Sequence, residues 1–179
     1  MMRNPWNRGY VQVYTGDGKG KTTAALGMAL RAAGHGFRTY IGQFMKGQPS
    51  GEHEAVKRLG GLITIETCGS GKFLSPEAPP EPAEVARARD GLARASAAML
   101  SGEYRIVVLD EVCVAINFGL LSVAEVLAFI GKRPEQTELV LTGRGAPPEL
   151  VGAADLVSDI RAVKHHFGQG VEARDGIER

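Results

Sequence analysis

Glycines, a lysine and a threonine form the part of this sequence with the clearest chemical potential. Residues 15–22 read Thr-Gly-Asp-Gly-Lys-Gly-Lys-Thr. Glycines let successive backbone N–H groups surround an anion, and a helix that follows them points its positive dipole end toward that anion. Lys21 can contact the outer phosphates of a nucleotide, and the Thr22 hydroxyl can ligate Mg²⁺. The residues predicted to contact the nucleotide in this loop are Thr15, Gly16, Asp17, Gly18, Lys19, Gly20, Lys21, Thr22 and Thr23.

The first position of this loop departs from the usual phosphate-binding pattern G-x-x-x-x-G-K-[ST]. Thr15 stands where the pattern has glycine, although Gly16, Gly18 and Gly20 keep the stretch rich in glycine. The alternative is a glycine-rich turn before a helix, with lysines that are only solvated. An apolar, β-prone run at 10–14 and an alanine-rich helical run at 24–33 flank the loop and favour the nucleotide site.

A pair of acidic residues ends the most apolar strand predicted, at 105–111. Ile-Val-Val-Leu precedes Asp110 and Glu111. In nucleotide-binding proteins of this type, an acidic residue after an apolar strand lies near the Mg²⁺ of the phosphate loop. The pattern is common when it occurs alone, but together with the glycine loop it predicts a metal site. The predicted Mg²⁺ ligands are Thr22, Asp110 and Glu111.

Two basic residues follow other predicted strands. Lys46 follows the strand at 38–44, and Arg144 follows the strand at 138–142. Ligands of open α/β sheets bind at the carboxyl ends of the strands, so both are candidate ligand contacts. The alternatives are a solvated loop lysine and a loop arginine that caps the next helix.

Strands and helices alternate along the chain, which predicts a parallel sheet with helices on both faces. The predicted strands are 10–14, 38–44, 62–66, 105–111, 138–142 and 156–160, and the predicted helices are 21–33, 52–59, 83–100 and 122–130. The segment at 68–82 is irregular because glycine and proline interrupt it, and its Phe73 and Leu74 either face a ligand or anchor the loop. We expect a single domain over 1–179, with an N-terminal arm at 1–8 and a C-terminal tail at 161–179.

Composition excludes several classes of protein. A net charge of +1 gives no basic field for nucleic acid, so no nucleic-acid partner is expected. No apolar run is long enough to cross a bilayer, and residues 1–8 do not resemble a secretory signal. Cys68 and Cys113 show no metal-binding or disulfide spacing. These observations predict a cytoplasmic protein without a membrane partner.

Four segments make the chain resemble the P-loop type of ATP:corrinoid adenosyltransferase, the family of cobinamide and cobalamin adenosyltransferases. They are TGDGKGKTTAALGMALRAAGHG, QFMKG, VVLDEVCVAINFGLL and LVLTGRGAPPELVGAADLVSDIRAVKHHFGQGVEARDGIE. The resemblance implies a P-loop NTPase-like (RecA-like) α/β fold. It also implies that a reduced Co(I) corrinoid, such as cob(I)alamin or cob(I)yrinic acid a,c-diamide, attacks the 5′ carbon of ATP and releases triphosphate. This reaction serves adenosylcobalamin biosynthesis or salvage.

The resemblance also implies roles for particular residues. Lys21, Thr22, Asp110 and Glu111 would be catalytic, with Arg144 as a further contact to ATP. The implied corrinoid-binding residues are Lys46, Phe73, Leu74, Val114, Asn117 and Phe118. A reduced flavoprotein as electron donor and a homodimer are implied as well. The sequence departs from its relatives in having a single aromatic residue in Gly71–Leu74, and in ending at Arg179 where relatives often have an aromatic residue.

Two other functions agree with the same residues. In an ordinary P-loop ATPase or kinase, Glu111 would orient or activate a water molecule and Arg144 would act as a finger residue. In a nucleotide-dependent regulatory or corrinoid-carrier module, both ligands would bind without turnover.

Overall fold

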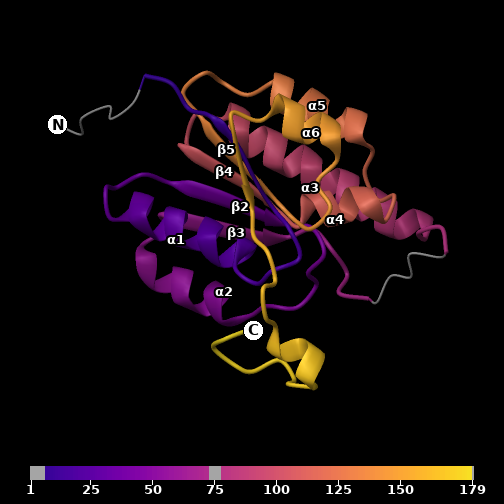
Figure 1. Cartoon of the computed structure of the whole chain (residues 1–179). Coiled ribbons are helices and arrows are strands. Elements are labelled where there is room, and N and C mark those ends of the chain that lie inside the picture. The colour runs from indigo at the N-terminus through magenta and orange to yellow at the C-terminus, as the bar shows by residue number, and fades with distance from the viewer. Residues whose placement is uncertain (1–6, 73–77, 179) are drawn as a thin grey trace.

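A six-stranded parallel sheet forms the centre of the protein (Figure 1). The computed structural model describes residues 7–72 and 78–178. The strands are β1 (Val11–Thr15), β2 (Thr39–Gln43), β3 (Ile63–Thr67), β4 (Ile106–Asp110), β5 (Glu138–Thr142) and β6 (Leu156–Asp159). Their order across the sheet is β3-β2-β4-β5-β1-β6, and every pairing is parallel. The predicted α/β class with a parallel sheet is therefore confirmed.

Helices cover both faces of the sheet (Figure 1). They are α1 (Lys21–Ala33), α2 (Gly51–Val56), α3 (Pro82–Leu100), α4 (Val112–Asn117), α5 (Val123–Gly131) and α6 (Pro148–Ala153), with short 3₁₀ helices η1 (Lys57–Leu59) and η2 (His166–Gln169). Figure 1 shows α1 and α2 on one face and α3 to α6 on the other. Two buried apolar clusters match these layers, one packed under α1 and one under α3 to α6.

The central strands are apolar because both of their faces are covered. All five residues of β4 are buried, while β6 lies at the edge of the sheet and exposes Leu156 and Val157. In β4 and β5 the burial continues to the carboxyl ends of the strands, where the polar residues Asp110 and Thr142 are also buried. The carboxyl edge of the sheet therefore carries polar side chains that water does not solvate.

Most of the predicted helices and strands are confirmed, with small shifts of their ends. Ser122 caps α5, and Glu125 completes the predicted capping box. The helix predicted at 52–59 is instead α2 followed by η1. The strand predicted to include Glu111 ends one residue earlier, and a short helix that the sequence analysis did not predict, α4, follows it.

No helix within 7–72 and 78–178 is both long and apolar enough to span a membrane.

Candidate active site

The glycine-rich loop connects the end of β1 to the start of α1 at the carboxyl edge of the sheet. The chain after β6 lies directly against this loop, and the Gly18 N–H donates a hydrogen bond of 2.7 Å to the Ile160 carbonyl. A Cβ atom on Gly16 would lie 2.4 Å from that carbonyl oxygen, and one on Gly18 would lie 2.7 Å from the Arg161 backbone. Glycine is required at both positions because two backbone segments pack together there.

Thr15 has a structural role at the position where the usual pattern has glycine. Its hydroxyl oxygen accepts a hydrogen bond of 3.1 Å from the Ala146 N–H, in the loop that follows β5. The Thr15 side chain therefore joins the glycine-rich loop to the loop after β5. Only the packing of β1 beside β5 brings these two residues together.

Lys21 is buried within the loop, with 7% of its surface exposed. Its Nζ donates to the carbonyl oxygens of Gly16 at 2.6 Å and Gly18 at 2.8 Å. Burial lowers the pKa of Lys21, and the carboxylate of Glu111 opposes this shift. The ammonium group thus occupies the centre of the loop. If a phosphate group bound there, its oxygens would replace these two carbonyl oxygens as hydrogen-bond acceptors.

Asp110 receives hydrogen bonds from three different elements, α1, β5 and β2. Its Oδ1 accepts from the Thr22 hydroxyl at 2.9 Å and from the Thr142 hydroxyl at 2.7 Å. The Gln43 amide lies 3.4 Å from Oδ2. Burial raises the pKa of Asp110, while these hydrogen bonds favour its ionised form. The predicted approach of Thr22 to Asp110 is present in the structure.

Glu111 immediately precedes α4 and has a left-handed backbone conformation, with φ 59° and ψ 22°. Its N–H donates to the Thr142 hydroxyl oxygen at 2.9 Å. Burial raises the pKa of Glu111, and the neighbouring charge of Asp110 raises it further, while Lys21 and Arg144 oppose both effects. The side chain therefore belongs to the same electrostatic cluster as the loop lysine.

Thr22, Asp110 and Glu111 carry oxygen atoms of the kind that a magnesium ion would take as ligands. Mg²⁺ prefers oxygen ligands and usually takes one or two carboxylates from the protein, with phosphate and water completing its shell. Across 7–72 and 78–178, no cluster of three or more His, Cys, Asp or Glu side chains forms a separate metal site. A metal at this edge would thus depend on a bound phosphate group for several of its ligands.

Lys46 is part of a hydrogen-bonded chain and is not a free loop lysine. Its Nζ lies 2.6 Å from Glu52 Oε1 and also donates to the Ser50 hydroxyl. Glu52 accepts from the Gln43 amide at 3.1 Å, and Gln43 in turn reaches Asp110. Burial opposes the ionised form of Glu52, but these hydrogen bonds outweigh it and lower the pKa of Glu52 to about 2. The sequence analysis missed Gln43 and Glu52. The only signals for them were that Gln43 ends β2 and that Glu52 lies in the first turn of α2.

Arg144 is exposed in the loop after β5, and its charge acts on Asp17, Lys21 and Glu111. The loop itself is held by Asn117, whose Nδ2 donates at 3.1 Å to the carbonyl oxygens of both Arg144 and Gly145.

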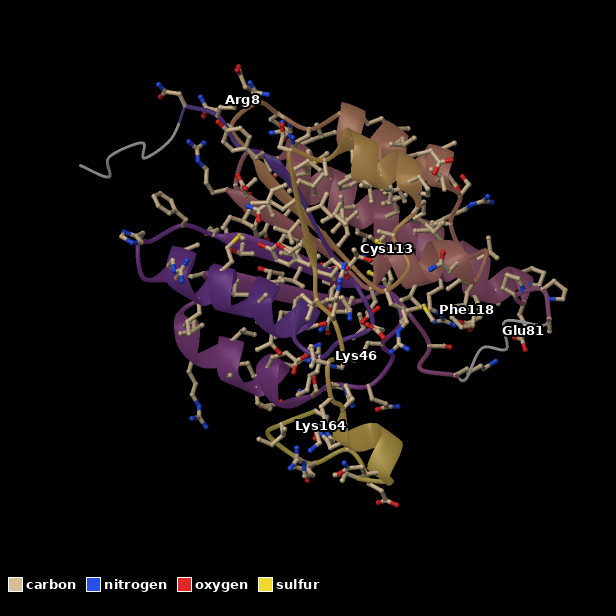
Figure 2. All side chains as sticks on the ribbon, in the orientation of Figure 1. Arg8, Lys46, Glu81, Cys113, Phe118 and Lys164 are labelled. Carbon is tan, nitrogen blue, oxygen red and sulfur yellow. The ribbon has the colours of Figure 1, made fainter. Side chains whose placement is uncertain are left out.

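The predicted corrinoid residues of α4 and its end are only partly accessible. Val114 and Phe118 are half-buried, and Phe118 packs against the buried cluster under α3 to α6. Figure 2 shows Lys46 and Phe118 on the side of the molecule from which the tail with Lys164 extends. The two other predicted corrinoid residues, Phe73 and Leu74, lie outside the described residues.

The C-terminal tail reaches the glycine-rich loop, which the sequence did not indicate. Lys19 Nζ donates to the Ile177 carbonyl at 2.8 Å and lies 3.8 Å from a Glu178 carboxylate oxygen. Glu178 is also bonded to Arg174 and lies 3.2 Å from His166. Asp17 accepts a hydrogen bond of 3.3 Å from the Ala162 N–H, while Thr23 is exposed on the first turn of α1. Of the loop's polar side chains, Lys21 and Thr22 thus face the acidic pair, and Asp17 and Lys19 face the chain after β6.

Comparison with known proteins identifies relatives over nearly the whole chain. A family model described as ATP:corrinoid adenosyltransferase BtuR/CobO/CobP matches residues 7–179. The chain is 37% identical to a corrinoid adenosyltransferase of Pseudomonas aeruginosa over 172 residues, which covers 96% of this chain and 84% of the relative. It is 35% identical over 172 residues to the corrinoid adenosyltransferase of Escherichia coli K12 and to corrinoid adenosyltransferase CobA of Salmonella typhimurium, with 96% of this chain and 86% of each relative covered.

Proposed function

The chain belongs to the ATP:corrinoid adenosyltransferase family, and on that basis we propose how its residues transfer the 5′-deoxyadenosyl group of ATP to a reduced corrinoid. The observation that carries the proposal is the meeting of the loop residues Lys21 and Thr22 with the acidic pair at the end of β4. This arrangement provides positive charge and oxygen ligands at one edge of the sheet.

The reaction itself sets what the site must supply. An electron pair of Co(I) forms a bond to the 5′ carbon of ATP, the bond between that carbon and its oxygen breaks, and the electrons of the broken bond leave with inorganic triphosphate. No proton moves in this step, so the site needs no general base. Catalysis must therefore come from alignment of the two substrates and from neutralisation of the leaving group.

Lys21 would stabilise the leaving triphosphate, together with loop N–H groups other than that of Gly18, which is bonded to the Ile160 carbonyl. In the structure the ammonium of Lys21 is bonded to the Gly16 and Gly18 carbonyls, so it is already held at the centre of the loop. We propose that phosphate oxygens take the place of these acceptors when ATP binds. The exposed guanidinium of Arg144 would add a second positive charge on the neighbouring loop.

Thr22, Asp110 and Glu111 would hold Mg²⁺. A bound Mg²⁺ would offset part of the negative charge of the triphosphate. The hydrogen bonds to Asp110 support this role because they favour its ionised form and so oppose the rise in its pKa that burial causes.

The corrinoid would lie over the edge formed by the loop after β2 and by α4. Lys46, Val114, Asn117 and Phe118 are the described residues proposed to contact it, and Phe73 and Leu74 are proposed in addition. The half-buried Val114 and Phe118 support the proposal because apolar surface at the lower face of cobalt disfavours an axial ligand, which makes Co(II) easier to reduce. We further propose a reduced flavoprotein as the electron donor, a homodimeric assembly and a cytoplasmic location.

The decisive experiment is anaerobic incubation of the protein with ATP, Mg²⁺ and chemically reduced cob(I)alamin. Conversion to the adenosylated corrinoid spectrum with stoichiometric triphosphate is the expected result. Steady phosphate release without spectral change would instead identify an ATPase. Tight binding of both substrates without either product would identify a binding module. Repeating the assay with cob(I)inamide and cob(I)yrinic acid a,c-diamide would rank the corrinoids.

A further inference from the structure

Thr142 ends β5 with a fully buried hydroxyl that has one partner on each side. It donates to Asp110 Oδ1 at 2.7 Å and accepts from the Glu111 N–H at 2.9 Å. An ionised carboxylate only accepts hydrogen bonds and a backbone N–H only donates them. The direction of the Thr142 hydroxyl is therefore fixed, with its proton toward Asp110 and a lone pair toward Glu111.

The backbone at Glu111 needs this support. Its φ of 59° lies in the left-handed region, which residues other than glycine, asparagine and aspartate seldom occupy. The chain leaves the sheet at this residue, so the Glu111 N–H hydrogen-bonds to a side chain and not to a neighbouring strand. The Thr142 hydroxyl thus stabilises the turn from which the Glu111 side chain extends.

Gly143, the residue after Thr142, also holds the end of β5 against the start of α4. Gly143 has φ 134°, and a Cβ atom there would lie 2.9 Å from the Cys113 Cβ and 3.0 Å from the Val114 N. The end of β5 therefore packs closely against the first turn of α4. Strand register places Leu141 beside Leu109, so Thr142 lies next to Asp110 in the adjacent strand.

We propose that Thr142 is a positioning residue for adenosyl transfer, because its one hydroxyl sets the orientation of both acidic residues of the metal site. The inference rests on the function proposed above. It adds that Asp110 and Glu111 act as one unit, held from β5 independently of the nucleotide loop. Thr22 also donates to Asp110 Oδ1, but Thr22 lies in the first turn of α1, directly after the loop, whereas Thr142 belongs to a central strand of the sheet.

Thr142→Val tests the proposal because it removes the hydroxyl and keeps the volume and branching of the side chain. Thr142→Ser is the rescue variant because it keeps the hydroxyl. Thr39→Val is the matched control: Thr39 is also fully buried in a central strand, at its opposite end, and its hydroxyl has no hydrogen-bond partner among the described residues.

Two measurements are needed. The first is the affinity of Mn²⁺ for the protein in the presence of ATP, followed by electron paramagnetic resonance. The second is kcat and KM for cob(I)alamin adenosylation. Loss of a residue that orients metal ligands lowers metal affinity or activity by about 10- to 100-fold. We expect that loss in Mn²⁺ affinity and kcat for Thr142→Val, with little change in KM for the corrinoid. We expect values close to the parent protein for Thr142→Ser and Thr39→Val.

Parent-like Mn²⁺ affinity and kcat in Thr142→Val would overturn the proposal, and so would equal losses in the valine and serine variants. If Thr142→Val does not fold, the serine variant decides: parent values support the role of the hydroxyl, and a loss of 10-fold or more contradicts it. The proposed function fails separately, through absence of adenosylation by the parent protein. The Mn²⁺ measurement still tests Thr142 in that case.

Discussion

The Thr22 hydroxyl donates a hydrogen bond of 2.9 Å to Asp110, although 88 positions separate the two residues in the chain. Thr22 lies in the first turn of α1, and Asp110 is the last residue of β4. The bond closes the site between a helix and a strand that are not neighbours in sequence. It also couples the loop that would bind triphosphate to the carboxylate that would bind the metal.

Lys21→Ala should impair the transfer step. The variant removes the only ammonium group bonded inside the loop, among the described residues, and so removes a positive charge from the leaving group. We expect kcat/KM for adenosylation to fall by about 10²- to 10³-fold, as for other preorganised charge-stabilising groups. The anaerobic corrinoid assay measures it. Lys57→Ala is the control because Lys57 is an exposed lysine outside the loop, and its effect should be far smaller. Near-parent turnover in Lys21→Ala would remove the loop from the mechanism.

Glu52→Gln should reduce stability in a pH-dependent way. The folded pKa of Glu52 is about 2, below its ordinary value of 4.5, so ionised Glu52 stabilises the fold above pH 4.5. That contribution is lost as the pH falls from 4.5 toward 2. At pH 7 we expect the variant to lose about 1–3 kcal/mol in the free energy of unfolding, typical of hydrogen bonds to a charged group. Urea unfolding at several pH values measures the difference.

The control for Glu52→Gln is Glu54→Gln on the same helix, where the partner Lys57 and Glu54 are both largely exposed. Exposed ion pairs contribute little, so this variant should stay close to the parent protein. A Glu52→Gln deficit that does not shrink between pH 4.5 and pH 2.5 would contradict the assigned pKa.

Gly143→Ala should destabilise the protein and lower its activity. The added Cβ would meet Cys113 at 2.9 Å, and the φ of 134° is unfavourable for alanine. We expect a loss of about 1–3 kcal/mol in the free energy of unfolding, the range for a residue forced into a sparsely populated backbone region. Gly27→Ala in α1 offers the opposite case, because a Cβ there meets nothing within 4 Å. It should stabilise by about 0.4–1 kcal/mol. Thermal melting of both variants checks the pair, and equal shifts in one direction would contradict the packing.

Glu178→Gln should strengthen ATP binding modestly. The carboxylate lies 3.8 Å from Lys19, so it competes with a triphosphate for that ammonium and repels the incoming charge. Solvent screens ion pairs of this kind, so we expect only about a two- to five-fold lower Kd for ATP at low salt. The difference should disappear at high ionic strength. Calorimetric titration measures it, with Glu172→Gln, an exposed tail carboxylate, as the control. Weaker ATP binding in Glu178→Gln would show that the tail assists the nucleotide.

The sequence predicted the elements whose signals are local. The order of strand, glycine loop and helix correctly predicted that a helix begins at Lys21, and the apolar run before Asp110 identified a central strand. It did not predict α4, because that helix starts from the left-handed conformation of Glu111. Nothing in the local residue types indicates that conformation; it depends on Thr142 from another strand.

The chain of hydrogen bonds from Lys46 through Glu52 to Gln43 was missed for a related reason. Each of these residues has an ordinary local context, and only the packing of the loop after β2 against the sheet brings them together. Thr15 is similar. Its departure from the usual pattern is explained by a bond to Ala146, a residue 131 positions away.

The position of β1 in the sheet has a consequence for synthesis of the protein on the ribosome. β1 pairs only with β5 and β6 among the described strands, and the backbone after β6 packs against Gly16 and Gly18. The glycine-rich loop therefore leaves the ribosome long before the strands and the backbone that hold it in shape. Because these contacts join distant parts of the chain, a growing polypeptide cannot form them until β6 has emerged. Nascent chains that stop before β6 should fail to bind ATP, so the enzyme acquires its nucleotide site only after β6 has left the ribosome.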